Sequence, residues 1–505
     1  MKILKTDQIR QLDQETIRLE PIASIDLMER ASLRFTESFM KLFGEIENPI
    51  ILFCGIGNNG GDGLAIARLL SQRFYRVVVY CCEIAAKRSL DAQQNFDRLP
   101  KRNNISVLNI QAGDPLPSLD PKGILIDALF GSGLNRPIEG YWADLVRTLN
   151  KHPGPIVAVD VPSGLMADQH SSGVSIHADY TISFELPKLA FLFPENAQRV
   201  GHWKSISIGL DQSTLATMSS YNTYITIAII KQILKLRNKF GHKGNFGHAL
   251  LMMGSYGKVG AAILAARACL RSGAGLVSIH APQCAYPILQ STVPEAMVSI
   301  DPHHYYCSEA PDLGRYKTIA IGCGMDTKSH CQSALEQVLA KAEVPLVLDA
   351  DALNLLAAHP ELQNQIPKNS ILTPHPKEFE RLFGPSANDF ERNQLQRTKA
   401  QELEVYLILK GAHTCIASPD GHCYFNSSGN PGMATGGSGD VLTGILAGLL
   451  AQGYSSLDAA LLGVYIHGLS GDLAIEHWVS EEALLASDLI DHLGRAYGKI
   501  RSTTV

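Results

Sequence analysis

The stretch Asn430-Pro-Gly-Met-Ala-Thr-Gly-Gly-Ser-Gly-Asp440 runs directly into the apolar segment Val441-Leu-Thr-Gly-Ile-Leu-Ala-Gly-Leu-Leu450. The apolar segment predicts a buried helix, so the glycines lie at its N-terminus, where unpaired N–H groups and the helix dipole favour an anion. Gly436, Gly437 and Gly439 allow a ligand to approach the backbone. Asp440 would lie in the first turn, as a general base that takes a proton from an attacking hydroxyl. The structural alternative is a glycine-rich turn capped by Asp440.

Other strand ends of the second half carry polar groups. Leu407-Ile-Leu-Lys410-Gly-Ala-His-Thr414 ends in a cation and a hydroxyl that suit a phosphate, although a surface lysine is the simpler alternative. The prolines of Thr373-Pro-His375-Pro fix His375 at a strand end, which favours contact with a ligand. Two more strands are followed by glycine-containing turns, which place Gly260 and Gly324 where a ligand could approach. Helix packing would explain Gly260 equally well. The sequence contains no Gly-x-x-x-x-Gly-Lys-Ser/Thr loop. The anion-binding helix start, Lys410 and Asp440 together indicate nucleotide-dependent phosphoryl transfer to a hydroxyl.

The first half alternates apolar strands with helices, which predicts a parallel, doubly wound α/β sheet of Rossmann-like type. We expect helical structure over residues 6–43, a strand over 50–54, the glycine-rich loop 55–63 and a helix from Leu64 to Gln72. That loop matches Gly-x-Gly-x-x-Gly, and Glu83 falls where a ribose-binding acid would lie, so a dehydrogenase is a rival interpretation. Asp62 in the same loop would repel a pyrophosphate.

Two more strands of the first half end in acids. Asp127-Ala-Leu-Phe-Gly131-Ser-Gly133-Leu-Asn135-Arg136-Pro137 and Asp160-Val-Pro-Ser163-Gly164 each follow an apolar run. Each acid alone could cap a turn, but successive parallel strands meet at one sheet edge, which favours a ligand site. The oxygens of Asn59, Asp127 and Ser163 together suit a hard cation. Lys188 is a weaker candidate for the same pocket.

The 505 residues exceed one typical domain, and 45% hydrophobic with 18% charged residues indicates a globular protein with ample core. A net charge of −5 gives no reason to expect nucleic acid or an anionic membrane as partner. The N-terminus lacks an apolar signal region, no apolar run approaches membrane-spanning length, and the ten cysteines are scattered, which predicts a cytoplasmic protein with reduced thiols. We place a linker within residues 210–224, between domains 1–215 and 225–505.

These motifs resemble a known family. Asn58-Asn-Gly-Gly-Asp62-Gly, Asp127-Ala-Leu-Phe-Gly-Ser-Gly-Leu and Asp160-Val-Pro-Ser-Gly164 resemble NAD(P)H-hydrate epimerases. Thr373-Pro-His-Pro-Lys-Glu-Phe379, Leu409-Lys-Gly411 and the 430–440 stretch resemble ADP- or ATP-dependent NAD(P)H-hydrate dehydratases, a branch of the ribokinase-like fold. Together they cover nearly the whole chain in the order of the fused bifunctional repair enzyme. Gly-Ser-Gly-Asp alone also fits vitamin and sugar kinases.

The resemblance implies a reaction that repairs damaged NADH or NADPH, in which water has added across a double bond of the nicotinamide ring. The first half would interconvert the R and S hydrates with K⁺ nearby. The second would phosphorylate the S form with ADP or ATP and Mg²⁺, then release phosphate. It also leads us to expect a homo-oligomer with small-molecule partners only.

The resemblance further implies roles for individual residues. The catalytic carboxylates are Asp440 and Asp160, and the K⁺ ligands are Asn59, Asp127 and Ser163. The hydrate would contact Asn58, Asn59, Gly60, Gly61, Asp62, Gly131, Ser132, Gly133, Leu134, Asn135, Arg136, Pro137, Gly260, Gly324 and His375. The adenine nucleotide would contact Lys410, Gly411, Ala412, His413, Thr414, Asn430, Pro431, Gly432, Met433, Ala434, Thr435, Gly436, Gly437, Ser438 and Gly439.

Three alternatives stay open at this point. The first is a vitamin-type kinase fused to a ligand-binding domain, which would leave a stable phosphorylated product. The second is a dehydrogenase in the first half. The third is a first half that serves only for assembly, against which the intact Asn59, Asp127 and Ser163 set argues.

Overall fold

The computed structural model describes residues 1–503 and divides into two compact units. One comprises Lys2–Ser220 with Asn388–Phe390. The other comprises Met1, Tyr221–Ala387 and the chain from Glu391 onward. The segment 210–224, where we placed the linker, is not irregular throughout, because it holds helix α7 (Gln212–Thr217) and strand β8 (Asn222–Tyr224).

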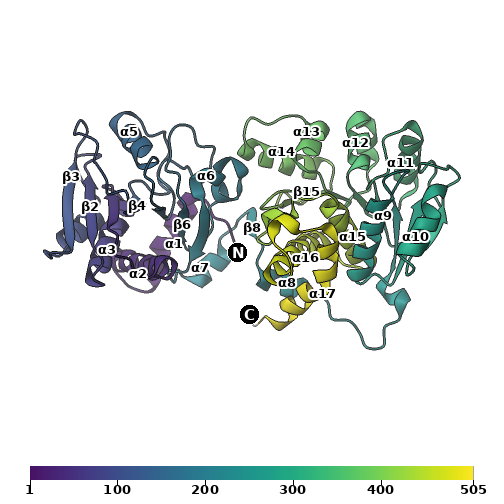
Figure 1. Ribbon diagram of the computed structural model, residues 1–505, viewed down its shortest axis with the longest axis horizontal. Helices are drawn as coiled ribbons and strands as arrows, with labels where there is room; N and C mark the ends of the chain where they lie inside the picture. The colour runs from purple at the N-terminus through teal and green to yellow at the C-terminus, as the bar shows by residue number, and fades with distance from the viewer. Residues whose placement is uncertain (504–505) are drawn as a thin grey trace. The chain divides into compact units, whose positions relative to one another are not determined.

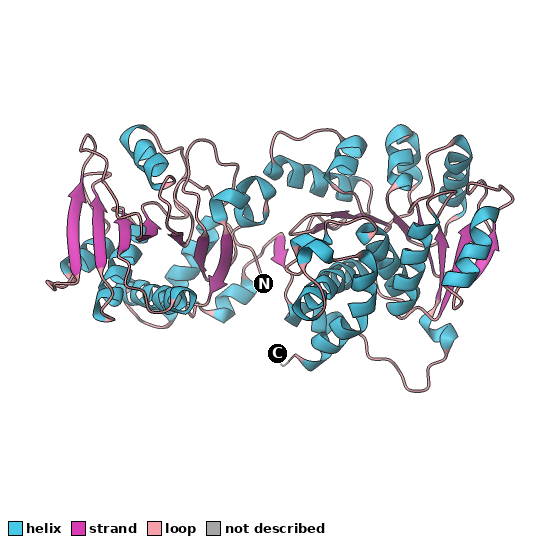
Figure 2. Cartoon of the chain, in the orientation of Figure 1, coloured by secondary structure: helices cyan, strands magenta, loops and turns pink. Residues whose placement is uncertain are grey.

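The first unit is a seven-stranded sheet of order β3-β2-β1-β4-β5-β6-β7, in which every neighbouring pair is parallel (Figures 1 and 2). The doubly wound α/β prediction for this half is therefore confirmed. The strands are β1 (Ile50–Cys54), β2 (Val77–Cys82), β3 (Ile105–Ile110), β4 (Ile124–Ala128), β5 (Ile156–Val159), β6 (Tyr180–Phe184) and β7 (His202–Ile206). The helices are α1 (Thr6–Leu19), α2 (Ser24–Phe43), α3 (Asn58–Gln72), α4 (Leu90–Asp97), α5 (Gly140–Leu149) and α6 (Ala197–Val200), with short 3₁₀ turns at Leu189–Leu192 and Pro194–Asn196.

Alternation along β1 decides which helices cover which face of this sheet. Ile50, Leu52 and Cys54 share a core with α2 and α3, whereas Ile51 and Phe53 share a core with α5 on the opposite face. Side chains of a strand point alternately to its two faces, so a fully apolar strand requires helices on both. Because helices cover both faces, the carboxyl ends of strands such as β1, β4 and β5 are the part of this sheet that a ligand can reach.

The second unit is a ten-stranded sheet of order β11-β10-β9-β12-β13-β14-β15-β16-β17-β8. The strands from β11 to β15 are parallel, and β16 pairs antiparallel with both β15 and β17. These strands are β9 (His248–Met252), β10 (Leu276–Ala281), β11 (Met297–Ile300), β12 (Thr318–Ile321), β13 (Leu346–Leu348), β14 (Ile371–Leu372), β15 (Tyr406–Leu409), β16 (Cys415–Ala417) and β17 (Cys423–Phe425).

Helices lie on both faces of this sheet (Figure 1). One face carries a large core shared by α8 (Ile227–Ile233), α9 (Val259–Arg271), α15 (Ser438–Ala451), α16 (Ser456–His477) and α17 (Ala486–Ser502). The remaining helices are α10 (Tyr286–Thr292), α11 (Ser329–Lys341), α12 (Asp351–Ala358), α13 (Pro376–Phe383) and α14 (Asp389–Glu402). Short 3₁₀ turns occupy Lys243–Phe246, Gln283–Ala285, Pro360–Gln365, Pro431–Met433 and Glu481–Ala483. Within residues 1–503, no helix combines the length and apolar character that crossing a bilayer demands.

Candidate active sites of the two units

The glycine-rich stretch after β1 is helical rather than a loop. We expected the helix to begin at Leu64, but α3 begins at Asn58, and its first helical bond runs from Gly61 N to Gly57 O. A Cβ at Gly60 would lie 1.9 Å from Gly55 O and one at Gly61 2.8 Å from Met28 Sδ, so both glycines are needed for packing. Any hydrogen bond that Gly60 and Gly61 donate to a ligand would come from their backbone amides in the first helical turn.

Asn59, Asp127 and Ser163 meet around the backbone of Phe130. Ser163 donates its hydroxyl and its amide to the two oxygens of Asp127, at 2.6 and 2.7 Å. The Asn59 amide donates to Phe130 O at 2.9 Å, and Ser163 Oγ lies 3.1 Å from the same carbonyl. Sequence reasoning missed Phe130 because a main-chain oxygen leaves no residue-type signal.

Asp127 is a buried carboxylate whose hydrogen-bond donors, Ser163 and the Leu129 amide, are uncharged. Burial raises the pKa of Asp127 to about 6, although hydrogen bonds from Ser163 oppose the shift. Asp127 accepts from the amides of Leu129 and Ser163, but the Ser163 hydroxyl and the Phe130 carbonyl also place oxygens beside it, and a hard monovalent cation bound there would neutralise the charge. The residues therefore fit the predicted K⁺.

The loop 131–137 lies against Asn59 and α1. A Cβ at Gly131 would lie 3.0 Å from Asn59 Cβ, and one at Gly133 would lie 2.6 Å from Arg10 Nη2. Arg136 is exposed and forms no ion pair within the described chain. Arg10, which comes from a helix about 120 residues earlier, was not singled out from the sequence.

Asp160 forms a buried ion pair with Lys188. Lys188 Nζ lies 2.9 Å from Asp160 Oδ1, and the lysine residue is only 2% exposed. The same carboxylate oxygen accepts from Ser183 Oγ and Phe184 N, both at 3.0 Å. Asp160 also adopts φ +60°, a conformation that side-chain-bearing residues rarely take and that is frequent at functional sites. Lys188, a weak candidate from sequence, thus contacts a predicted catalytic residue.

Two further carboxylates, Asp62 and Asp13, interact electrostatically with Asp160. Burial, with a further contribution from Asp160, raises the pKa of Asp62 well above its ordinary value. Burial and then Asp160 raise the pKa of Asp13 to about 7. Asp13 lies on α1, one helical turn after Arg10, and sequence reasoning missed it because no motif marks it. Glu83, considered as a ribose ligand, instead forms an ion pair with Arg88.

In the second unit, the 430–440 stretch begins α15 as predicted. Gly437 is the N-cap with φ +90°, a conformation that glycine adopts without strain, and Asp440 lies in the first turn. Burial raises the pKa of Asp440 to about 6, with nearby Asp349 raising it and Cys323 and Lys410 lowering it. A carboxylate with this pKa at the anion-binding end of a helix is suited to general-base catalysis.

Lys410 lies directly over the glycine turn. Its Nζ is 2.9 Å from Asp349 Oδ1, and a Cβ at Gly439 would lie 3.5 Å from that Nζ. The second oxygen of Asp349 accepts from Thr443 Oγ1 at 2.8 Å. Burial opposes the charge on Lys410, but Asp349 and then Glu378 raise its pKa above the usual value. Lys410 therefore presents a permanent positive charge beside Asp440.

The turn 411–414 connects β15 to β16. Thr414 Oγ1 accepts from Gly411 N at 3.2 Å and donates to Gly411 O at 2.9 Å. His413 Nδ1 lies 3.0 Å from Asn426 O, so its ring packs toward the neighbouring strand. Burial lowers the pKa of His413, which keeps this ring neutral.

Two residues of α16 hold the glycine stretch in place and had no motif to reveal them. Asp472 accepts from Gly429 N at 2.9 Å and from the Asn430 side chain at 3.1 Å. His467 Nε2 lies 3.0 Å from Ser438 O, and burial lowers its pKa to about 4. A neutral His467 therefore donates to Ser438 O and fixes the start of α15.

The predicted hydrate contacts of this unit follow strands β9, β12 and β14, with Gly260 in the first turn of α9. His375 caps α13, and its Nδ1 accepts from the amides of Lys377 and Glu378 at 3.1 and 3.3 Å. This fixes the tautomer with the proton on the half-exposed Nε2. Gly324 has φ +60°, and a Cβ there would lie 2.8 Å from Lys258 O. A Cβ at Gly260 would meet nothing within 4 Å, which removes helix packing as an explanation for Gly260.

The comparisons with known proteins cover both units. A family model described as NAD(P)H-hydrate dehydratase matches residues 249–495, and one described as YjeF-related protein N-terminus matches residues 24–190. The bifunctional NAD(P)H-hydrate repair enzyme Nnr of Moorella thermoacetica is 37% identical over 98% of this chain and 96% of its own. The Escherichia coli K12 protein of the same name is 32% identical over 97% of this chain and 92% of its own.

Solved structures match the second unit. The ADP/ATP-dependent NAD(P)H-hydrate dehydratase of Bacillus subtilis, co-crystallised with ATP and Mg²⁺, is 34% identical with a TM-score of 0.50 and covers 55% of this chain and 98% of its own. A ribokinase-like superfamily protein of Enterococcus faecalis is 26% identical with a TM-score of 0.50, covering 57% of this chain and 99% of its own. The ribokinase-like prediction is thus confirmed.

The fold and the sites define a two-unit α/β enzyme with a nucleotide-type site at a glycine-rich helix N-terminus. The chain belongs to the family of bifunctional NAD(P)H-hydrate repair enzymes, as the resemblance of its motifs predicted.

Proposed function

We propose that this enzyme repairs hydrated NADH and NADPH. Its first domain, residues 1–215, interconverts the R and S hydrates, and its second domain, residues 225–505, returns the S form to NAD(P)H at the expense of ADP or ATP. The observation that carries the proposal is the position of Asp440 beside Lys410 at the glycine-rich start of α15. A carboxylate and an ammonium at one helix end support the roles of base and phosphate-binding cation that we propose for them.

In the second domain, Asp440 accepts the proton of the ring hydroxyl, whose oxygen then attacks the terminal phosphorus of the nucleotide. The bond to the leaving phosphate oxygen breaks, and AMP or ADP departs. Lys410 and the amides around Gly439 balance the charge on the phosphates. The phosphorylated oxygen then leaves the ring as phosphate, and the neighbouring ring carbon loses a proton, which restores the double bond.

The half-exposed Nε2–H of His375, which lies 3.5 Å from Glu378 Oε1, would donate a hydrogen bond to the hydrate. Mg²⁺, when bound, would neutralise phosphate charge. Lys410 and Thr443 already occupy the carboxylate of Asp349. Phosphate oxygens and water would therefore supply most of the Mg²⁺ ligands, as is usual for this ion.

In the first domain, the hydrated carbon bears both the ring nitrogen and the hydroxyl. Inversion requires one of these bonds to break and to reform on the opposite face, with a proton removed and returned. Asp160 would move that proton, and Lys188 would hold its carboxylate in position. K⁺, when bound by Asn59, Asp127 and Ser163, would supply positive charge to this site, and Arg136 would pair with the pyrophosphate.

The ten cysteines are all unpaired thiols, and nine of them are buried. This supports our proposal that the enzyme works in the reducing cytoplasm.

The test is recovery of reduced-nicotinamide absorbance from a mixture of R and S NADH hydrates, with ADP or ATP and Mg²⁺. Full recovery is expected. Recovery that stops at the S fraction would remove the epimerase activity and leave a binding module. No recovery with either nucleotide, together with a stable phosphorylated product from another substrate, would favour a small-molecule kinase.

A further inference from the structure

Two exposed tyrosines form a fixed pair at the edge of the second unit. Tyr256 follows β9 and is 69% exposed, and Tyr305 follows β11 and is 45% exposed. Their ring centroids lie 5.2 Å apart at an interplanar angle of 83°, and Tyr256 N donates to Tyr305 O at 3.0 Å. Edge-to-face contact holds one ring against the other and leaves aromatic faces open to solvent.

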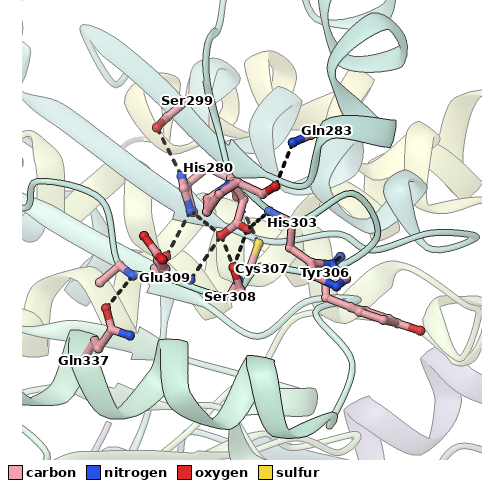
Figure 3. A network of polar contacts seen from close by, with 12 residues as sticks. His280, Gln283, Ser299, His303, Tyr306, Cys307, Ser308, Glu309 and Gln337 are labelled. Atoms are coloured by element: carbon pink, nitrogen blue, oxygen red, sulfur yellow. Dashed lines mark hydrogen bonds and ion pairs between the residues drawn. The ribbon is translucent and has the colours of Figure 1, made fainter.

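A network of polar contacts around His280 and His303 holds the loop 301–309, which carries Tyr305 (Figure 3). Asp301, at the end of β11, is fully buried and accepts from the amides of His303 and Ser308, both at 2.8 Å. His280 Nε2 lies 3.1 Å from the same carboxylate. Although burial alone would raise it, these hydrogen bonds hold the pKa of Asp301 at about 2. His303 Nδ1 in turn accepts from Tyr305 N at 3.1 Å.

His280, Asp301 and Cys307 are close enough to suggest a metal site, because one ligand atom from each lies within 4.8 Å of the others. The carboxylate, however, faces N–H and O–H donors, and His280 Nδ1 is engaged by Ser299 Oγ at 3.1 Å. Burial raises the pKa of the Cys307 thiol well above its usual value. The cluster therefore anchors the loop rather than binding a metal.

The loop that carries Tyr256 is joined to the candidate active site. Ser255 Oγ donates to Gly324 O at 2.8 Å, and Gly254 N donates to Cys323 O at 2.9 Å. Cys323 in turn adjoins Asp349 and Asp440. The loop that carries Tyr256 is therefore fixed to the segment 323–324 that adjoins Asp349 and Asp440.

The pair lies on the flank opposite Lys410. Strands β12, β13 and β14 separate β9 from β15, and four strand spacings amount to roughly 19 Å. The base of a nucleotide held by the turn 411–414 lies near β15 and is far from Tyr256. A second, dinucleotide ligand is long enough to extend from Asp440 toward the tyrosines.

We propose, on the basis of the function proposed above, that Tyr256 and Tyr305 form a stacking surface for the adenine base of the NAD(P)H hydrate. The surface binds the remote half of the substrate and takes no part in the chemistry at Asp440. Stacking of one base on an aromatic side chain is worth about a ten-fold change in affinity, and it requires only the π-face.

The test compares the S form of NADH hydrate with the hydrate of reduced nicotinamide mononucleotide, which lacks the adenosine half. In the full chain, Tyr256→Ala should raise KM for NADH hydrate about ten-fold with little change in kcat. KM for the truncated hydrate and for ADP should not change. Tyr256→Phe should retain the wild-type KM, and Tyr305→Ala should behave like Tyr256→Ala. Tyr221→Ala, at the exposed β8 edge of the same sheet, is the matched control.

Equal losses with both hydrates, or a raised KM for ADP, would overturn the stacking surface and leave the repair function intact. If the wild-type protein turned over neither hydrate, the proposed function would fail instead. Calorimetric binding of NADH to the wild type and to Tyr256→Ala would then decide the stacking separately: weaker binding by the variant supports it, and equal binding overturns it.

Discussion

The ammonium of Lys410 lies 2.9 Å from one carboxylate oxygen of Asp349, and the hydroxyl of Thr443 lies 2.8 Å from the other. Lys410 comes from the end of β15, Asp349 from the end of β13 and Thr443 from α15. This relationship ties the ammonium that we propose as the phosphate-binding group to the helix that carries Asp440. It thus links the stability of the second unit to the geometry of its active site.

Asp349→Ala should destabilise the second unit by about 2–4 kcal/mol, because the largely buried Lys410 ammonium then keeps only the more distant carboxylate of Glu378, at 3.7 Å. Thr443→Val removes only one hydrogen bond and should cost about 1 kcal/mol. Differential scanning calorimetry of the full chain measures both. Equal effects of the two variants would mean that the ion pair contributes little.

Gly439→Ala should weaken ADP binding at least ten-fold and leave the melting temperature nearly unchanged. A Cβ there would occupy the space 3.5 Å from Lys410 Nζ, where a phosphate would lie, without meeting the backbone. Gly444→Ala, on the same helix, is the control: its Cβ would lie 2.1 Å from Ala265 O and should lower the melting temperature. Isothermal titration with ADP and calorimetric melting separate the two outcomes. Wild-type ADP affinity in Gly439→Ala would contradict the assigned phosphate position.

Asp440→Asn should abolish dehydration of the S hydrate and preserve nucleotide binding, because only the base is lost. Since the pKa of Asp440 is about 6, the wild-type kcat/KM should fall as pH drops below about 6 and level off above it. The pH profile with the S hydrate measures this. Loss of ADP binding in Asp440→Asn would point to a structural role for the carboxylate.

Asp127→Ala should abolish epimerisation and leave dehydration of the S hydrate unchanged. K⁺ should stabilise the first unit of the wild type against heat, and the effect should weaken below about pH 6, because the pKa of Asp127 is about 6 and a protonated carboxyl loses its attraction for the cation. Melting temperatures in KCl and in LiCl at two pH values provide the check. Unchanged R-to-S conversion in Asp127→Ala would remove this residue from the site.

Asp13→Asn should stabilise the first unit at pH 8. The folded pKa of Asp13, about 7, lies above its ordinary value of 3.8, so its contribution to stability is full below pH 3.8 and is lost as pH rises through 7. Removal of the charge should therefore raise the melting temperature at pH 8 by about 2–4 °C and have little effect near pH 4. Destabilisation at pH 8 would show that the carboxylate is instead favourably paired.

Local sequence signals predicted the doubly wound first unit, the start of α15 and the strand-end positions of Asp127, Asp160 and Lys410. They failed at α3, which begins at Asn58 instead of Leu64. Glycines disfavour a helix in isolation, but here the absence of a Cβ at Gly60 and Gly61 allows α3 to pack against Gly55 and Met28. Tertiary packing outweighed local propensity.

The sequence by itself determined the fold class and the family, because strand periodicity and the motifs around Asp127 and Asp440 are short-range patterns written in residue types. Only the tertiary structure decided which groups interact: Asp13 electrostatically with Asp160, Phe130 O with Asn59 and Ser163, His467 with Ser438, and Tyr256 with Tyr305. These partners lie far apart along the chain or act through the main chain. Their proximity arises from strand order and helix packing, which a linear pattern of residue types does not encode locally.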